Sequence, residues 1–443
     1  MYFHQYLKRE IHLTAQAAWR SGVGKNAASL YTIQFANYIL PLITVPYLVR
    51  VLGPEYFGLV AFGQGLIAYF VVFVDYGFAL SATRKISIER DDMKAVSRTA
   101  STVWAAKGLI CVAALAVLLL LVTVVPKLNE LTSLLLILYG TVVGNALFPV
   151  WIFQGMEKMV FISVINLAMS LLVVIGIFTM VRQPEHYLLY AALISLGAVG
   201  AGLTGMGVAF YKFRLQAVIP SMRDIWESLV EGWLLFLSTA SVSLYTVGNA
   251  FILGLLTNSI VVGYYSAAEK IVKAVRGILS PVGQAAYPRF SKLALESRCR
   301  ALEWGKRMLV AISALGGGLS IALLAGATTI VRILLGSEYE PSIVVMRVLA
   351  GLPLLIGMSN VLGVQIMLPF GKDRAFMTIL LGAGLINIVF AVWLAPIWQA
   401  AGMAAAVLIS ETFVTVTMFI YLRHHSLSPL NKVSPEVTFP LVK

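Results

Sequence analysis

The chain has 443 residues, of which 59% are hydrophobic and only 12% are charged. Soluble domains carry about 25% charged residues, so this composition leaves too little polar surface for a water-soluble globule and indicates a protein whose solvent is the bilayer. The net charge of +13 fits either nucleic acid or a membrane surface, and only its distribution along the chain distinguishes these partners.

The first 25 residues form a polar segment that we expect in the cytoplasm. They contain no long apolar core, so the segment is not a cleavable signal peptide. It is either a short amphipathic helix on the membrane surface or a solvated tail.

Apolar runs of about 20 residues, the length that a membrane span requires, follow as far as residue 422. They predict an all-α integral membrane protein with twelve transmembrane helices. The predicted spans are approximately 26–51, 55–80, 99–125, 131–152, 160–181, 187–211, 230–256, 259–283, 305–331, 341–368, 375–396 and 400–422. The domain organisation that follows is 1–25, a first bundle at 26–211, a cytoplasmic linker at 212–229, a second bundle at 230–422 and a cytoplasmic tail at 423–443.

The distribution of lysine and arginine supports this count. With the N-terminus inside, most cations fall on inner loops, the longest of which are near 81–98, 212–229 and 284–304. This is the positive-inside pattern, so it places both termini in the cytoplasm and explains the net charge without nucleic acid. All outer connections are short, which argues against a membrane glycosyltransferase or polymerase with an external catalytic domain.

Several polar side chains inside the predicted spans are candidates for function. Tyr31 and Tyr38 could stack on a substrate, although bundle packing explains them equally well. Asn145 and Asn249 could line a binding cavity, but interhelical hydrogen bonds are the more common use of such residues. Asp75 and Glu411 are candidate proton carriers for coupled transport, with a structural ion pair as the alternative for each. Lys107 is a candidate cavity cation.

A short motif occurs twice. Val51-Leu-Gly-Pro-Glu-Tyr56 leads into the second span, and Leu334-Leu-Gly-Ser-Glu-Tyr339 precedes the tenth. Gly58 of the second span also aligns with Gly263 of the eighth. The two motifs are either remnants of two homologous halves, an architecture common in transporters, or two independent uses of a turn that favours helix entry.

The eighth predicted span contains a charged run, from Glu269 to Arg276. At about 100° per residue, Glu269, Lys273 and Arg276 share one face, and Lys270 lies about 100° from Glu269, on the margin of that face. A charge at the bilayer centre costs about 2.5–3.5 kcal/mol on insertion scales, so these residues should face water rather than lipid. They form a cationic wall of a water-filled cavity, unless the cations extend to the inner interface and meet no substrate.

No cofactor or metal is expected. The two cysteines, Cys111 and Cys299, form no CxxC motif and lie near no histidine cluster, and we find no pairing of a nucleophile with a base.

Five segments resemble the Wzx-type O-antigen and polysaccharide flippases, a branch of the multidrug/oligosaccharidyl-lipid/polysaccharide exporter superfamily. The segments are 37–59, 75–78, 151–155, 264–271 and 279–289, and the resemblance extends from about residue 25 to 425. It implies two pseudo-symmetric six-helix bundles around a central cavity, with alternating access. It also implies a substrate of undecaprenyl-diphosphate-linked oligosaccharide, moved from the inner to the outer leaflet of a bacterial inner membrane. For such a substrate the cationic wall would attract the diphosphate through Lys273, Arg276, Lys270 and Lys107, and the candidates for contact with the sugars are Tyr31, Tyr38, Asn145 and Asn249.

Three questions stay open at this point. A small-molecule drug or cation antiporter of the same superfamily is the main alternative function. The coupling ion is either a proton or sodium, if transport is coupled at all. A polysaccharide polymerase and a chain-length regulator are the candidate protein partners besides membrane lipid.

Overall fold

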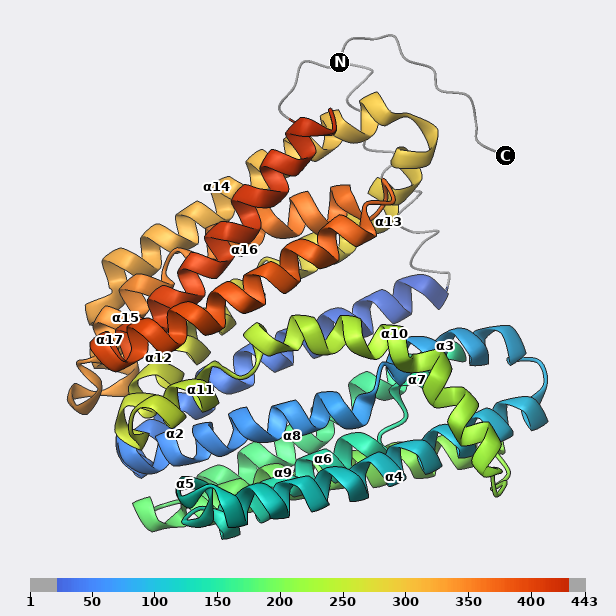
Figure 1. The fold of residues 1–443 in the computed structure, drawn as a ribbon, viewed down its shortest axis with the longest axis horizontal. Helices are drawn as coiled ribbons and strands as arrows, with labels where there is room; N and C mark the ends of the chain where they lie inside the picture. The colour runs from blue at the N-terminus through green and yellow to red at the C-terminus, as the bar shows by residue number, and fades with distance from the viewer. Residues whose placement is uncertain (1–21, 430–443) are drawn as a thin grey trace. The chain divides into compact units, whose positions relative to one another are not determined.

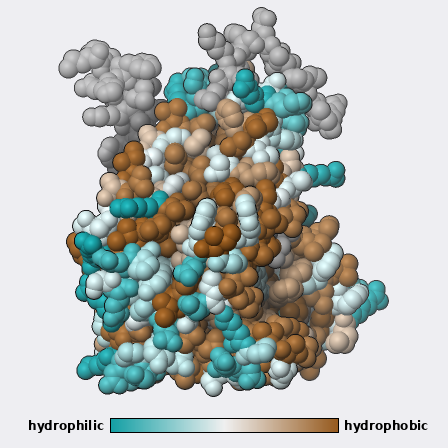
Figure 2. Space-filling view, turned by 60° about the vertical axis from the view of Figure 1, so that its left-hand side comes forward, coloured by the Kyte–Doolittle hydropathy of each residue, from teal (hydrophilic) through white to brown (hydrophobic). Residues whose placement is uncertain are grey.

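The computed structural model describes residues 22–429, with side chains from residue 40 onward except at positions 238, 241, 242, 244, 245, 281, 284, 285 and 288. Every regular element in this range is helical (Figure 1). Eight helices of the described part are long and apolar enough to cross a membrane. Figure 2 shows large contiguous hydrophobic areas on the visible surface, which soluble monomeric proteins rarely expose. The prediction of an all-α membrane protein is confirmed.

Two of these eight helices contain a break and therefore change direction within the membrane protein. α2 (Gly22–Asp75) has a non-helical backbone at Gly53, and α17 (Asp373–His424) has one at Gln399. A straight helix of 52 residues would be about 78 Å long, more than twice the hydrocarbon thickness of about 30 Å. Instead α17 folds back as two antiparallel segments (Figure 1), so close that a Cβ on Gly402 would overlap the carbonyl oxygen of Leu394.

The remaining elements are compatible with twelve passes. In chain order they are α3 (Phe78–Glu89), α4 (Met93–Val124), α5 (Pro126–Asn129), α6 (Thr132–Leu147), α7 (Val150–Gly155), α8 (Val160–Met180), η1 (Pro184–His186), α9 (Tyr187–Phe213), α10 (Met222–Thr246), α11 (Asn249–Leu256), α12 (Ser259–Gly277), α13 (Ser280–Glu296), α14 (Arg298–Ile330), η2 (Val331–Leu335), η3 (Ser337–Tyr339), α15 (Ser342–Leu349), α16 (Leu352–Asn360) and η4 (Val361–Met367). The seventh and eighth predicted spans fall on α10 to α13, outside the eight helices that are both long and apolar enough to cross a membrane. For α12 the reason is its charged run.

The chain forms two compact units. Unit 1 is Leu66–Ala240 with the chain up to Leu40, and unit 2 is Pro41–Gly65 with the chain from Ser241 on. Residues 41–65 of the first two predicted spans therefore pack with the C-terminal half. The division into bundles at 26–211 and 230–422 stays a prediction.

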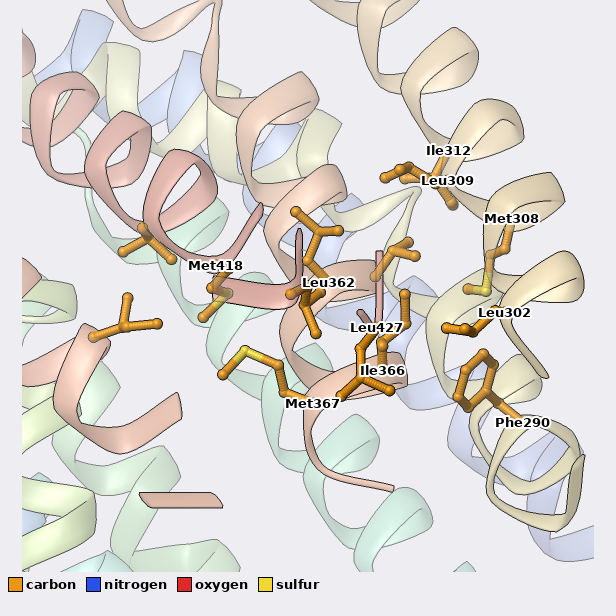
Figure 3. Packing of buried hydrophobic residues seen from close by; sticks show 14 of the residues in the cluster. Phe290, Leu302, Met308, Leu309, Ile312, Leu362, Ile366, Met367, Met418 and Leu427 are labelled. Carbon is orange, nitrogen blue, oxygen red and sulfur yellow. The ribbon is translucent and has the colours of Figure 1, made fainter. Parts of the chain in front are cut away.

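Each unit has its own hydrophobic core. In unit 1 the core gathers around Trp151, whose ring meets that of Trp104 edge-on at 5.4 Å between centroids. In unit 2 it brings Phe290, Leu302 and Met308 together with Leu362 and Ile366 (Figure 3). Both cores combine residues from helices that are distant in the sequence, so tertiary packing between helices stabilises each unit.

The two copies of the Leu-Gly-x-Glu-Tyr motif have the same backbone conformation. Gly53 has φ 69° and ψ 173°, and Gly336 has φ 94° and ψ 174°. Positive φ with extended ψ is almost restricted to glycine, so both motifs need glycine at this position. The turns lie close together in unit 2, where the Arg50 guanidinium donates a hydrogen bond to the Ile333 carbonyl.

α2 crosses α12 at a contact between backbones. A Cβ added to Gly58 would overlap the Ser259 carbonyl oxygen, and one added to Gly263 would overlap that of Pro54. Gly58 and Gly263 are the two positions that the sequence comparison aligned, and they lie against each other: the same hypothetical Cβ on Gly58 would be 2.7 Å from the Gly263 nitrogen. Small residues permit this approach, as is common between membrane helices.

A second crossing joins α2 to α11 through paired glycines and phenylalanines. The Phe62 ring fills the space beside Gly254, and Phe251 lies against Gly65. The two rings are 5.2 Å apart between centroids. Each glycine thus provides the gap that the opposite phenylalanine occupies.

We expect Gly263→Ala to lower stability by at least about 3 kcal/mol, the upper range for overpacking, because its methyl group meets backbone that cannot rotate away. Gly318→Ala is the matched control, since a Cβ there meets nothing within 4 Å; it should leave stability unchanged or raise it slightly. Thermal unfolding in detergent measures both. Equal melting temperatures for the two variants would contradict the close crossing.

Candidate functional site

α12 brings the charged run to one side of an otherwise apolar helix. Asn258 caps the helix, its side chain accepting a hydrogen bond of 3.0 Å from the Val261 amide. Ala267, Ile271 and Ala274 are among the residues buried on the opposite side. This packing fixes the helix rotation, and the charged side chains take the remaining face.

Glu269 and Lys273 form an ion pair on this face. The Lys273 ammonium lies 3.0 Å from Glu269 Oε2, and the exposed fractions of the two side chains are 45% for lysine and 15% for glutamate. The i,i+4 order with glutamate first is the favourable one. Lysine has three N–H donors, so one contact with Glu269 leaves the exposed ammonium able to bind a further anion.

Glu269 has a second partner that the sequence analysis did not single out. The Tyr265 hydroxyl donates to Glu269 Oε1 at 3.1 Å, and the Asn249 side chain lies within hydrogen-bonding reach of the same hydroxyl. Asn249 is buried, so its amide is part of this internal network and is not presented on an open surface. The spacing of Tyr265 four residues before Glu269 was the available signal.

The other two cations of α12 have different surroundings. The Lys270 ammonium lies over the Phe57 ring, 4.8 Å from its centroid, a cation–π contact. Arg276 is half-buried and lies within electrostatic reach of the Glu411 carboxyl on α17. Lys273 is therefore the most exposed of the three cations, and each cation has an anion or a π face nearby.

In unit 1, Lys107 and Asp75 form a buried ion pair. The Lys107 ammonium lies 2.8 Å from Asp75 Oδ1, with exposed fractions of 3% for lysine and 36% for aspartate. This geometry favours charge pairing, which was the alternative for Asp75. Lys107 belongs to unit 1 and the α12 cations to unit 2, so their gathering around one cavity stays a prediction.

Asp75 ends α2 at a break in the helix. Tyr76 and Gly77 follow with φ values of 48° and 74°, and left-handed backbone is unusual for tyrosine. The Tyr76 ring stacks on Phe236 of α10 at 4.7 Å between centroids. The ion pair and the stacked rings together hold this strained corner in place.

The remaining candidates do not join either group. Asn145 is exposed and donates its amide to the Thr141 carbonyl of its own helix at 2.8 Å. The side chains of Tyr31 and Tyr38 lie outside the described residues. Among the described residues, no group of three histidine, cysteine, aspartate or glutamate side chains could hold a metal ion.

Comparisons with known proteins agree with this architecture. A family model described as "Polysaccharide biosynthesis protein" matches residues 23–294, more than half of the chain. Two relatives share the name "Putative O-antigen transporter". The one from Escherichia coli (strain K12) is 33% identical over 403 residues, covering 91% of this chain and 97% of its own. The one from Shigella dysenteriae is 28% identical over 399 residues, covering 89% and 98%.

Solved structures of similar fold come from two kinds of transporter. The lipid II flippase MurJ in an inward closed conformation matches with a TM-score of 0.72 at 16% identity, covering 89% of this chain and 87% of its own. An inward-facing multidrug resistance MATE family transporter matches with a TM-score of 0.64 at 12% identity, covering 90% and 98%. At these identities the likeness concerns the fold alone.

The Lys107–Asp75 pair predicts an asymmetric response to mutation. Asp75→Ala leaves an ammonium unpaired at 3% exposure, which should cost about 3–5 kcal/mol. Lys107→Ala leaves a carboxylate that reaches solvent, and we expect a loss of about 1 kcal/mol. Thermal unfolding in detergent measures the difference. The double variant should be more stable than Asp75→Ala alone, and equal losses for the two single variants would contradict this account.

Proposed function

Because the chain belongs to the polysaccharide biosynthesis protein family, we propose that it is a flippase for an oligosaccharide linked to undecaprenyl diphosphate, carrying it from the inner to the outer leaflet of a bacterial inner membrane. The relatives named as O-antigen transporters support the oligosaccharide. The fold that it shares with a lipid II flippase supports a lipid-linked cargo. These relatives and structural neighbours are transporters and not enzymes, which supports a transport function for this chain.

The observation that carries the proposal is the cationic face of α12. A lipid-linked sugar has a diphosphate that must pass a region of low dielectric constant, and stripping its water is costly. Lys273 offers an exposed ammonium, and Arg276 offers a planar fork that binds two phosphate oxygens at once. Uncharged or cationic cargo would gain nothing from these groups.

The paired carboxylates suit a step in which the cargo must also leave. Glu269 holds Lys273, and Glu411 lies near Arg276, so the diphosphate competes with a resident anion for each cation. This competition keeps the affinity for the diphosphate moderate, and each carboxylate pairs with its cation again when the cargo departs. In this proposal the two bundles alternate access to the site, with both termini in the cytoplasm.

Glu411 is the candidate for ion coupling. Its protonation would remove the anion beside Arg276 and strengthen the pull on the diphosphate, and its deprotonation would favour release. We expect Glu411→Gln to flip cargo at a rate that no longer responds to an imposed proton gradient. Flipping assays in proteoliposomes, with and without an imposed proton gradient, measure this. A response that persists in the variant, or one that follows sodium instead, would assign coupling elsewhere.

The alternative is a small-molecule antiporter, which the fold of the multidrug transporter permits. It would use acidic side chains to bind cations, and Asp75 and Glu411 are available. Both acids have a cation beside them, however, and α12 adds further positive charge.

A polysaccharide polymerase and a chain-length regulator are the proposed protein partners, because both act on the same lipid-linked product.

The first experiment measures flipping of a fluorescent diphosphate-linked oligosaccharide in proteoliposomes. Lys273→Ala and Arg276→Ala should each lower the rate at least about tenfold, because a charge-assisted hydrogen bond of about 1.5–3 kcal/mol corresponds to about ten- to hundredfold. Lys292→Ala is the control, since Lys292 is an exposed lysine in another i,i+4 pair, with Glu296.

Three outcomes are informative. Loss in both α12 variants with an active control places these cations in the pathway. Normal flipping by both variants at matched protein levels makes the α12 charges structural. A wild-type protein that moves small cations but no lipid-linked sugar supports the antiporter.

A further inference from the structure

We propose that Tyr265 is a positioning residue that fixes Glu269, and through it the exposed Lys273 ammonium. The transport consequence rests on the proposed function. The positioning itself does not, because it concerns contacts within unit 2 that are measurable without any cargo.

The geometry places one carboxylate between two partners. Glu269 Oε1 accepts from the Tyr265 hydroxyl at 3.1 Å, and Glu269 Oε2 lies 3.0 Å from the Lys273 ammonium. With each oxygen engaged by a different group, the carboxylate has little freedom to rotate. Tyr265 is fully buried, so its hydroxyl is a fixed point rather than a mobile surface donor.

Lysine needs such a support because its ammonium sits on a flexible four-carbon stem. An isolated i,i+4 pair on a helix is weak and would hold Lys273 in one position only part of the time. The buried hydroxyl makes Glu269 a rigid counter-ion, and Asn249 of α11 supports the hydroxyl in turn. The position of Lys273 is thereby tied to the packing of α11 against α12.

A plainer explanation is that every buried tyrosine hydroxyl needs a partner and that Glu269 happens to supply it. Tyr339 argues against this explanation. It belongs to the same unit and is also fully buried, yet no described residue forms a hydrogen bond with its hydroxyl. Burial alone therefore does not bring a carboxylate to a tyrosine in this protein.

Tyr339 also provides the matched control, because Tyr265→Phe and Tyr339→Phe delete the same atom from equally buried rings. The first readout is acetylation of Lys273 by limiting acetic anhydride, followed by mass spectrometry of purified protein. We expect Tyr265→Phe to speed acetylation about fivefold, the factor that corresponds to a hydrogen bond of about 1 kcal/mol, because a loosened Glu269 stabilises the ammonium less. Tyr339→Phe should match wild type.

The second readout is flipping in proteoliposomes. Tyr265→Phe should lower the rate about fivefold, and Tyr339→Phe should not. Since Tyr265 acts through Glu269, Tyr265→Phe should have no further effect on either readout in a Glu269→Gln background, as expected for coupled residues. Glu269→Gln alone should also speed acetylation of Lys273, which tests the arrangement with Tyr265 intact.

Unchanged Lys273 acetylation in folded Tyr265→Phe would overturn the inference, and so would an effect that adds fully to that of Glu269→Gln. If the wild type flips no lipid-linked oligosaccharide, the proposed function fails while acetylation still decides the positioning. If flipping proceeds in every variant but acetylation changes as expected, Tyr265 positions a lysine that transport does not use, and the transport part is wrong.

Discussion

A charge in an apolar solvent must have a partner, and the arrangement of both units follows from this constraint. Lys107 is buried and meets Asp75 at 2.8 Å, and Glu269 lies between Tyr265 and Lys273. Breaking either group would leave a charge that lipid cannot solvate. Lys273 differs from Lys107 in its exposure, because 45% of its side chain stays exposed while it pairs with Glu269, against 3% for Lys107.

Close packing by small residues is what allows such polar groups to be placed at all. Where α2 crosses α12, Gly58 and Gly263 let the backbones touch, and the exchange of Phe62 and Phe251 across two further glycines fixes the neighbouring helix α11. Asn249 begins α11, and Tyr265 follows Gly263 on α12 by two residues. The polar network therefore lies directly beside closely packed helix crossings of unit 2.

Much of the fold was predictable because its signals are local. Apolar runs predict the helices, and the resemblance to the polysaccharide transporters, confirmed by the family match, depends on contiguous segments. The common face of Glu269 and Lys273 follows from helical spacing alone. An ion pair was an open alternative for Asp75, but neither Lys107 as its partner nor the contact of Tyr265 with Glu269 was predicted. Each depends on which of several neighbours a side chain meets. The break in α17 at Gln399 falls between the spans predicted at 375–396 and 400–422, three residues after Pro396, although Gln399 itself is neither glycine nor proline.

Two segments of the described part of the chain are π-helical, η2 at Val331–Leu335 and η4 at Val361–Met367. They change the angular positions that a helical wheel predicts for side chains. A π turn holds about one residue more than an α turn, so every side chain beyond it is rotated by roughly 100° relative to an unbroken helix. α12 has no such segment, and angular reasoning is sound there. η4 ends its helix and is followed by a turn at 368–371, so the change of phase falls on the residues of η4 itself. Gln365 lies within η4, and its side-chain amide donates to the Gly283 carbonyl of α13 at 2.8 Å. A single-residue deletion in η4 ahead of Gln365 would rotate this side chain by roughly 100° about the helix axis and turn it away from α13.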